Sequence, residues 1–182
     1  MAGSVGHART WRRGTAPLLV VLASCTSTTP PPTDSMPARA PAERTVVVAV
    51  IDGDTVDVRI AGRAERVRLI GVDTPETVHP NKPVECYGPE ASARLSELLP
   101  PGTEIDLAGD VEERDRYGRL LAYVLRRTDD LFVNLALVAE GYAGILPLPP
   151  NTAFAADLEA AEAAARAARL GRWGSCAAGA GR

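Results

Sequence analysis

Residues 45–60 read TVVVAVIDGDTVDVRI, and this stretch decides how the chain folds. Thr45–Ile51 is a run of mostly β-branched residues, which is typical of a buried strand. Asp52-Gly53 favours a turn, because these two residue types accept the backbone angles of tight bends. Apolar residues then alternate with polar ones from Val56 to Ile60, as in a half-buried strand. The sequence therefore predicts two strands joined by a sharp turn.

Asp54 follows that turn in the phase of the apolar residues of the second strand. Because strand side chains alternate between faces, its carboxylate is expected to point toward the core at the end of the strand. A solvated turn residue would more naturally take the opposite phase. Charge placed on a core face is costly unless it is paired, so Asp54 is a candidate functional residue.

The next predicted strand, residues 65–72, carries Arg68 and is followed by Asp73. These two residues are an odd number apart, so a regular strand would send their side chains to opposite faces. Gly71 lies between them and permits a bulge or kink. Arg68 and Asp73 can therefore serve one site only if the chain bends at Gly71.

The remaining pattern predicts a mainly β, α+β domain spanning residues 44–176. Pro89 is suited to the first turn of a helix that follows Gly88, and Gly141 to the end of a helix capped by Asn134. Five strands with helices after the third and the fifth favour a small closed barrel with three packed helices. The other expected elements are strands at residues 103–107 and 119–125 and a helix at residues 152–170.

The first 24 residues have the features of a signal peptide, with arginines followed by a short apolar run at residues 16–23. The run ends in Leu-Ala-Ser-Cys, which resembles the lipobox of bacterial lipoproteins, so Cys25 is the expected lipidation site. We expect an exported protein held on the outer side of the cell membrane; the alternative is an ordinary secreted one. Residues 25–43, rich in Ser, Thr and Pro, predict a disordered tether, and residues 177–182 a flexible tail.

Charge and cysteine content narrow the possible functions. Removal of residues 1–24 leaves 17 basic against 23 acidic residues, a net charge of about −6, unlike domains that grip duplex DNA through many phosphates. Apart from Cys25, only Cys86 and Cys176 remain, an even pair in an exported protein, so we expect a disulfide between them. The two histidines argue against a conventional zinc site.

Four blocks of sequence resemble the thermonuclease family, the micrococcal or staphylococcal nuclease-like domains. In this chain they are DGDTV at residues 52–56, RLIGVDTPE at 68–76, YGPEAS at 87–92 and DRYGR at 115–119. The resemblance runs in order from Thr45 to Trp173. It implies an OB-fold five-stranded barrel with three helices, in agreement with the strand count.

The resemblance also implies a chemistry, which the residue types suit. Asp54, Asp73 and the carbonyl of Thr74 are hard oxygen ligands for Ca²⁺, and Pro75 biases Thr74 toward an extended conformation. Glu76 is expected to act on the attacking water as general base or electrostatically. Further expected residues are the phosphate-binding pair Arg68 and Arg119 and the substrate contacts Tyr117 and Lys82.

The family carries tyrosines that flank the nucleotide base, and here the segment reads ILPLPPN at residues 145–151, without an aromatic stacking face. The sequence thus predicts a monomeric, exported, Ca²⁺-dependent, sugar-nonspecific nuclease. Its expected substrates are DNA and RNA, preferably single-stranded or frayed, cleaved to 3′-phosphorylated products. The alternatives are an inactive OB-fold module that binds nucleic acid or another phosphorylated ligand, and a structural envelope lipoprotein.

Overall fold

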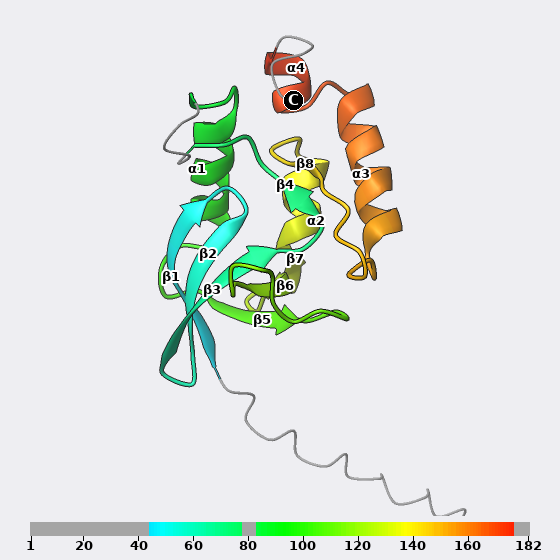
Figure 1. Cartoon of the computed structure of the whole chain (residues 1–182). Helices are drawn as coiled ribbons and strands as arrows, with labels where there is room; N and C mark the ends of the chain where they lie inside the picture. Colours follow the sequence, from blue (N-terminus) through cyan, green and yellow to red (C-terminus); the bar gives the residue numbers. More distant parts are fainter. Residues whose placement is uncertain (1–43, 78–82, 177–182) are drawn as a thin grey trace, which may run out of the picture. The chain divides into compact units, whose positions relative to one another are not determined.

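The computed structural model describes residues 44–77 and 83–176 of the 182-residue chain. Eight strands and four helices follow one another in this part (Figure 1). In order, they are β1 Thr45–Asp52, β2 Thr55–Ile60, β3 Arg63–Leu69, β4 Val72–Asp73, α1 Gly88–Leu98, β5 Glu104–Ala108, β6 Leu120–Arg126, β7 Leu131–Phe132, α2 Val133–Ala139, β8 Gly144–Ile145, α3 Ala155–Ala167 and α4 Arg172–Ser175. The predicted signal peptide, lipidation site Cys25, tether and tail, and the predicted substrate contact Lys82, lie outside the described residues.

Five strands close into the predicted barrel. Antiparallel pairs join β3 to β2, β2 to β1, β1 to β5 and β5 to β6. The barrel closes through a parallel pairing of β3 with β6, in which Arg68 lies opposite Leu121. This closed, mainly β architecture confirms the predicted fold class. Short β7 extends the sheet beyond β6, and β4 pairs separately with β8.

The first strand is less buried than the sequence predicts. Val47 is fully buried, but Val48 is 40% exposed. The pairing of β1 with β2 is irregular between Val47 and Ala49, so the alternation of faces breaks there. A run of β-branched residues therefore marks the strand correctly but does not reveal that one face near Val48 is open to solvent.

The bend expected between Arg68 and Asp73 is present. Strand β3 ends at Leu69, and the chain turns through Gly71, whose φ is +76°, before β4 begins. A positive φ is accessible to glycine at little cost, whereas other residues are strained by it. The structure thus confirms both the position and the cause of the break in this strand.

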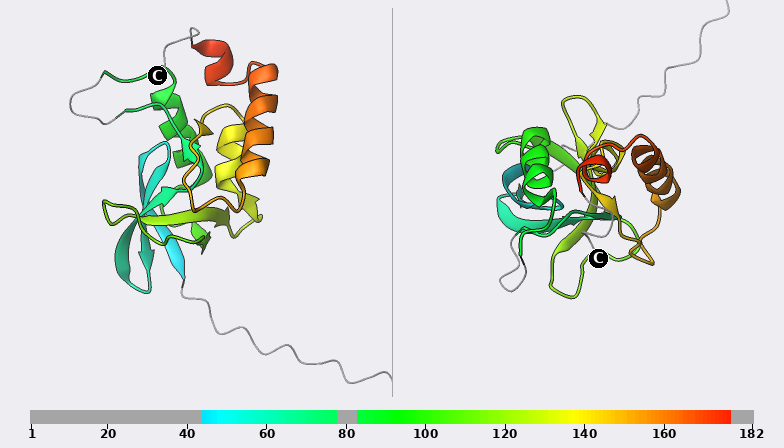
Figure 2. Two further views of the ribbon diagram at one scale, coloured as in Figure 1. Left: turned by 45° about the vertical axis from the view of Figure 1, so that its right-hand side comes forward. Right: turned by 90° about the horizontal axis from the view of Figure 1, so that it is seen from above.

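Helices α1 and α2 lie against the barrel, and α3 lies on the outer side of α2 (Figures 1 and 2). Helix α1 packs on β1 and buries Ala91, Leu95 and Leu98, and α2 packs against β6 and α3. Asn134 does not cap α2, as the sequence suggested; it lies inside the helix and is fully buried. Its side chain accepts from Val124 N and donates to Ile70 O, so it links the helix to the barrel.

Residues 172–176, at the end of the described domain, are held by a disulfide and by hydrogen bonds. Residues 172–175 form α4, and Cys176 just after it is bonded to Cys86 just before α1. The Arg172 amide also donates to Gly141 O at 2.9 Å. None of the helices in residues 44–77 and 83–176 has both the length and the apolar character needed to cross a bilayer.

Candidate active site

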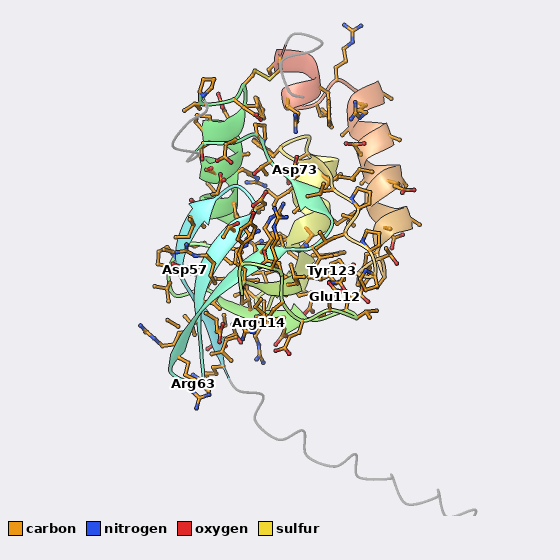
Figure 3. The ribbon with its side chains drawn as sticks, in the orientation of Figure 1. Asp57, Arg63, Asp73, Glu112, Arg114 and Tyr123 are labelled. Carbon is orange, nitrogen blue, oxygen red and sulfur yellow. A yellow bond between two sulfur atoms is a disulfide. The ribbon has the colours of Figure 1, made fainter. Side chains whose placement is uncertain are left out.

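Asp54, Arg68 and Asp73 meet where the β1–β2 turn faces the bend after β3. The Arg68 Nη2 atom lies 3.1 Å from Asp54 Oδ2 and 3.8 Å from Asp73 Oδ1. Its other terminal nitrogen donates to Leu69 O at 2.7 Å, which fixes the plane of the guanidinium. Asp54 and Arg68 are buried, as the phase argument predicted for Asp54, and Asp73 projects from β4 (Figure 3). One arginine therefore lies between two carboxylates, one from the β1–β2 turn and one from β4.

Thr74 completes this group through its amide and hydroxyl. Both donate to Asp54 Oδ2, each at 3.3 Å, and the Thr55 hydroxyl donates to the other oxygen of Asp54 at 2.9 Å. Gly53 permits this approach, because a Cβ there would lie 2.7 to 2.9 Å from three Thr74 side-chain atoms. The glycine of the Asp-Gly-Asp motif is thus needed for close packing as well as for the turn.

The acids of this region repel one another. Partial burial and then the Asp54 charge raise the pKa of Asp73, against the lowering effect of Arg68 and Arg172. Burial likewise raises the pKa of Asp52, with the charges of Asp54 and Glu76 adding to it. A site that gathers carboxylates in this way favours the binding of a cation.

Glu76 is held from both sides by its neighbours. The Thr77 amide donates to Glu76 Oε1 at 3.0 Å, and the Thr77 hydroxyl donates to Asp52 at 2.9 Å. The Glu76 amide donates to the Glu85 carboxylate at 3.2 Å, and the Glu85 amide returns a bond to Glu76 O at 2.9 Å. Asp52 and Glu85 therefore fix the backbone that carries Glu76.

Arg119 comes from the turn before β6 and is oriented by Asp115. Its Nε donates to Asp115 Oδ2 at 2.7 Å, which leaves its two terminal nitrogens outside this bond. Burial acts to raise the pKa of Asp115, but bonds from Arg119 and from the Tyr117 amide outweigh it and hold that pKa below its ordinary value. Tyr117 is 68% exposed and lies 5.6 Å from the Arg119 guanidinium.

The two arginines expected to bind phosphate share one cavity of about 100 Å³. Arg68 and Arg119 both line it, because the parallel pairing places the start of β6 beside the end of β3. Leu146 and Leu148 line the same cavity. Two guanidinium groups at one cavity can bind the oxygens of a single phosphate.

The predicted metal ligands, catalytic residues and Tyr117 thus lie in one region, and the predicted Lys82 lies outside the described residues. The Thr74 contacts found here involve its amide and hydroxyl rather than the carbonyl expected to bind the metal. Within residues 44–77 and 83–176, no group of three or more His, Cys, Asp or Glu side chains is arranged to hold a metal ion. Calcium binding therefore stays a prediction.

Sequence reasoning missed two supporting residues. Asp115 lies four residues before Arg119. Opposite charges at this spacing often pair within a helix, but here the pair forms in a turn. Glu85 carries no signal of its own, because its contact with Glu76 depends on how residues 83–87 return to the barrel.

Several known nucleases are similar in sequence to this chain. The family model described as staphylococcal nuclease homologue matches residues 66–175. The thermonuclease of Staphylococcus intermedius is 44% identical over 131 residues, 72% of this chain and 76% of that protein. The thermonuclease of Staphylococcus hyicus is 41% identical over 127 residues, 70% and 73% of the two chains. Endonuclease YncB of Bacillus subtilis (strain 168) is 41% identical over 125 residues, 68% of this chain and 58% of that protein.

Proposed function

The chain belongs to the thermonuclease family and is a nuclease, and from this premise we propose that it is an exported, Ca²⁺-dependent enzyme that cleaves both DNA and RNA. The observation that carries the proposal is that Arg68, held between Asp54 and Asp73, shares a cavity with Arg119. A binding module needs the arginines but has no need of paired acids beside them. This arrangement supports hydrolysis at a phosphate bound between the two guanidinium groups.

The donor set fits calcium. Asp54 and Asp73 supply carboxylate oxygens, the Thr74 carbonyl is a third hard ligand, and water can complete the shell. The raised pKa of Asp73, caused by burial and by Asp54, supports a need for a cation there. When bound, the ion supplies positive charge to a non-bridging phosphate oxygen.

The chain's own residues divide the remaining work. Arg68 and Arg119 bind phosphate oxygens and stabilise the charge that builds up in the transition state. Glu76, positioned by Thr77 and Glu85, accepts a proton from the attacking water or orients it. Water oxygen bonds to phosphorus as the bond from phosphorus to the 5′ oxygen breaks. The 5′ oxygen takes up a proton and leaves as a hydroxyl, and the phosphate stays on the 3′ oxygen.

The substrate and the location complete the proposal. Burial of Arg68 and the small cavity favour a single or frayed strand, because a paired duplex would keep its phosphodiester away from the buried guanidinium. We place the enzyme as a monomer on the outer side of the membrane, anchored through Cys25. The Cys25→Ala variant tests the anchor. We expect this variant to lose its membrane association and to be released in soluble form.

The decisive experiment incubates the purified protein with denatured DNA and with RNA, in calcium and in chelator. We expect cleavage to 3′-phosphorylated fragments in calcium only. Glu76→Gln and Arg119→Ala are expected to lose at least about 100-fold in rate while the thermal midpoint stays near that of the parent. Equal survival of nucleic acid in calcium and chelator contradicts the metal dependence, and full activity of both variants contradicts the assigned site.

A further inference from the structure

A second concave surface adjoins the active site. This groove, of about 540 Å³, lies over β2 and β3 and reaches the turn that carries Tyr117 and Arg119. Arg119 lines both the groove and the cavity that holds Arg68. A polymer bound at the cavity can therefore continue into the groove without leaving the protein surface.

The acids of the groove are neutralised by arginines. Asp57 accepts two bonds from Arg66, at 2.7 and 2.9 Å, and Glu65 accepts two from Arg114, at 2.9 and 3.1 Å. Arg59, exposed on β2, takes part in none of the ion pairs found among residues 44–77 and 83–176. The groove thus presents positive charge, although the protein as a whole is acidic.

Tyr117 lines the groove as an exposed aromatic side chain, 5.6 Å from the guanidinium of Arg119, which lines both groove and cavity. The Arg116 guanidinium lies 4.8 Å from the centre of its ring, and Arg116 Nη2 donates to the tyrosine hydroxyl at 2.7 Å. Exposed aromatic rings beside cationic grooves are the common means of holding single-stranded nucleic acid without sequence preference. The neighbouring arginine also orients the ring, so that less side-chain entropy is lost on binding.

We propose that this groove binds the nucleotides that flank the scissile phosphate of a single-stranded polynucleotide, with Arg59 contacting a backbone phosphate. The proposal rests on the nuclease function proposed above and assigns it an extended binding site. The strand leaves the cavity at Arg119, passes Tyr117 and lies over β2 and β3. The corresponding sheet face of OB-fold domains is a common surface for oligonucleotides.

The test measures binding apart from cleavage. Fluorescence anisotropy in calcium, with Glu76→Gln as the parent, compares labelled single-stranded oligodeoxynucleotides of about 3 and about 12 nucleotides. Arg59→Ala is expected to weaken binding of the longer strand by about 3- to 10-fold, and Arg59→Glu by more. The loss should be smaller for the shorter strand. The slope of log affinity against log salt should fall by about 0.7 for the lost phosphate contact.

Arg127→Ala is the control, because it makes the same change of net charge at an exposed arginine that lies outside the groove and pairs with Asp106. It is expected to bind both strands as the parent does. If the Arg59 variants bind the longer strand with the affinity and salt slope of Arg127→Ala, or if the parent binds both lengths equally, the groove is not a binding site. If the wild-type protein does not cleave in calcium but the Arg59 variants still bind the longer strand more weakly, the proposed catalysis is wrong and the groove is still a binding site.

Discussion

The bond between Cys86 and Cys176 offers a sharp test of what holds the domain together. It links two cysteines that lie 90 residues apart in the sequence, one just before α1 and the other just after α4. In the double variant Cys86→Ser/Cys176→Ser, α4 is expected to keep its other contacts. The Arg172 amide donates to Gly141 O, and the Arg166 guanidinium lies 3.7 Å from the centre of the Trp173 ring. The folded state should therefore change little.

The main effect then falls on the unfolded chain, which gains freedom when the loop opens. In the chain-entropy treatment, a loop of about 90 residues contributes about 4 to 5 kcal/mol to the free energy of unfolding. For a domain of this size, that loss corresponds to a fall in the melting temperature of about 15 °C. It is a large share of the stability of an ordinary domain.

Urea unfolding of the protein without its signal peptide provides the measurement. Trp173 is then the only tryptophan of the chain and lies beside α3, so its fluorescence follows the loss of the C-terminal packing. The parent treated with reductant serves as control and should match the double variant. A loss below about 1 kcal/mol would refute the reasoning, because it would mean that the cross-link constrains neither state appreciably.

Three further expectations concern single positions. Asn134→Ala should lower the free energy of unfolding by about 2 to 4 kcal/mol, measured by urea unfolding, because two buried backbone groups lose their partner. Gly71→Ala should cost about 1 to 3 kcal/mol in the same measurement and also slow cleavage, because φ is +76° and the new Cβ would lie 2.5 Å from Leu158. The pKa of the Asp115 carboxyl, measured by NMR titration, should lie below its ordinary value of 3.8 and rise in Arg119→Ala. Because this pKa is lower in the folded state, Asp115 contributes stability above pH 3.8, and that stability is lost as the pH falls through the folded-state pKa.

Much of the local structure could be predicted because it depends on neighbours in the chain. The alternation of β2 places Asp54 on the core face, and the structure buries it. The odd spacing of Arg68 and Asp73 demands a bend, and Gly71 supplies it. Both arguments use only the two-residue period of a strand and the wider range of backbone angles open to glycine.

The same local rules misjudged residues whose partners are distant. Asn134 has the residue type of a helix cap, yet it is buried inside α2, where its amide bonds to Val124 N on β6 and to Ile70 O in the bend after β3. Glu85 carries no signal in the sequence, yet its carboxylate and amide bond to the backbone of Glu76. Neither pairing follows from spacing, since both depend on where separate segments meet.

The strand phases, the bend at Gly71, the residue types of the site and the family could all be read from the amino-acid sequence. That Arg68 and Arg119 line one cavity is seen in the folded protein alone. They come together because the barrel closes by pairing β3 with β6, and a parallel pairing between segments about 50 residues apart is set by the packing of the whole barrel and its helices rather than by either segment. The groove over β2 and β3 reaches the active site for the same reason, since that closure brings the turn carrying Tyr117 to its edge.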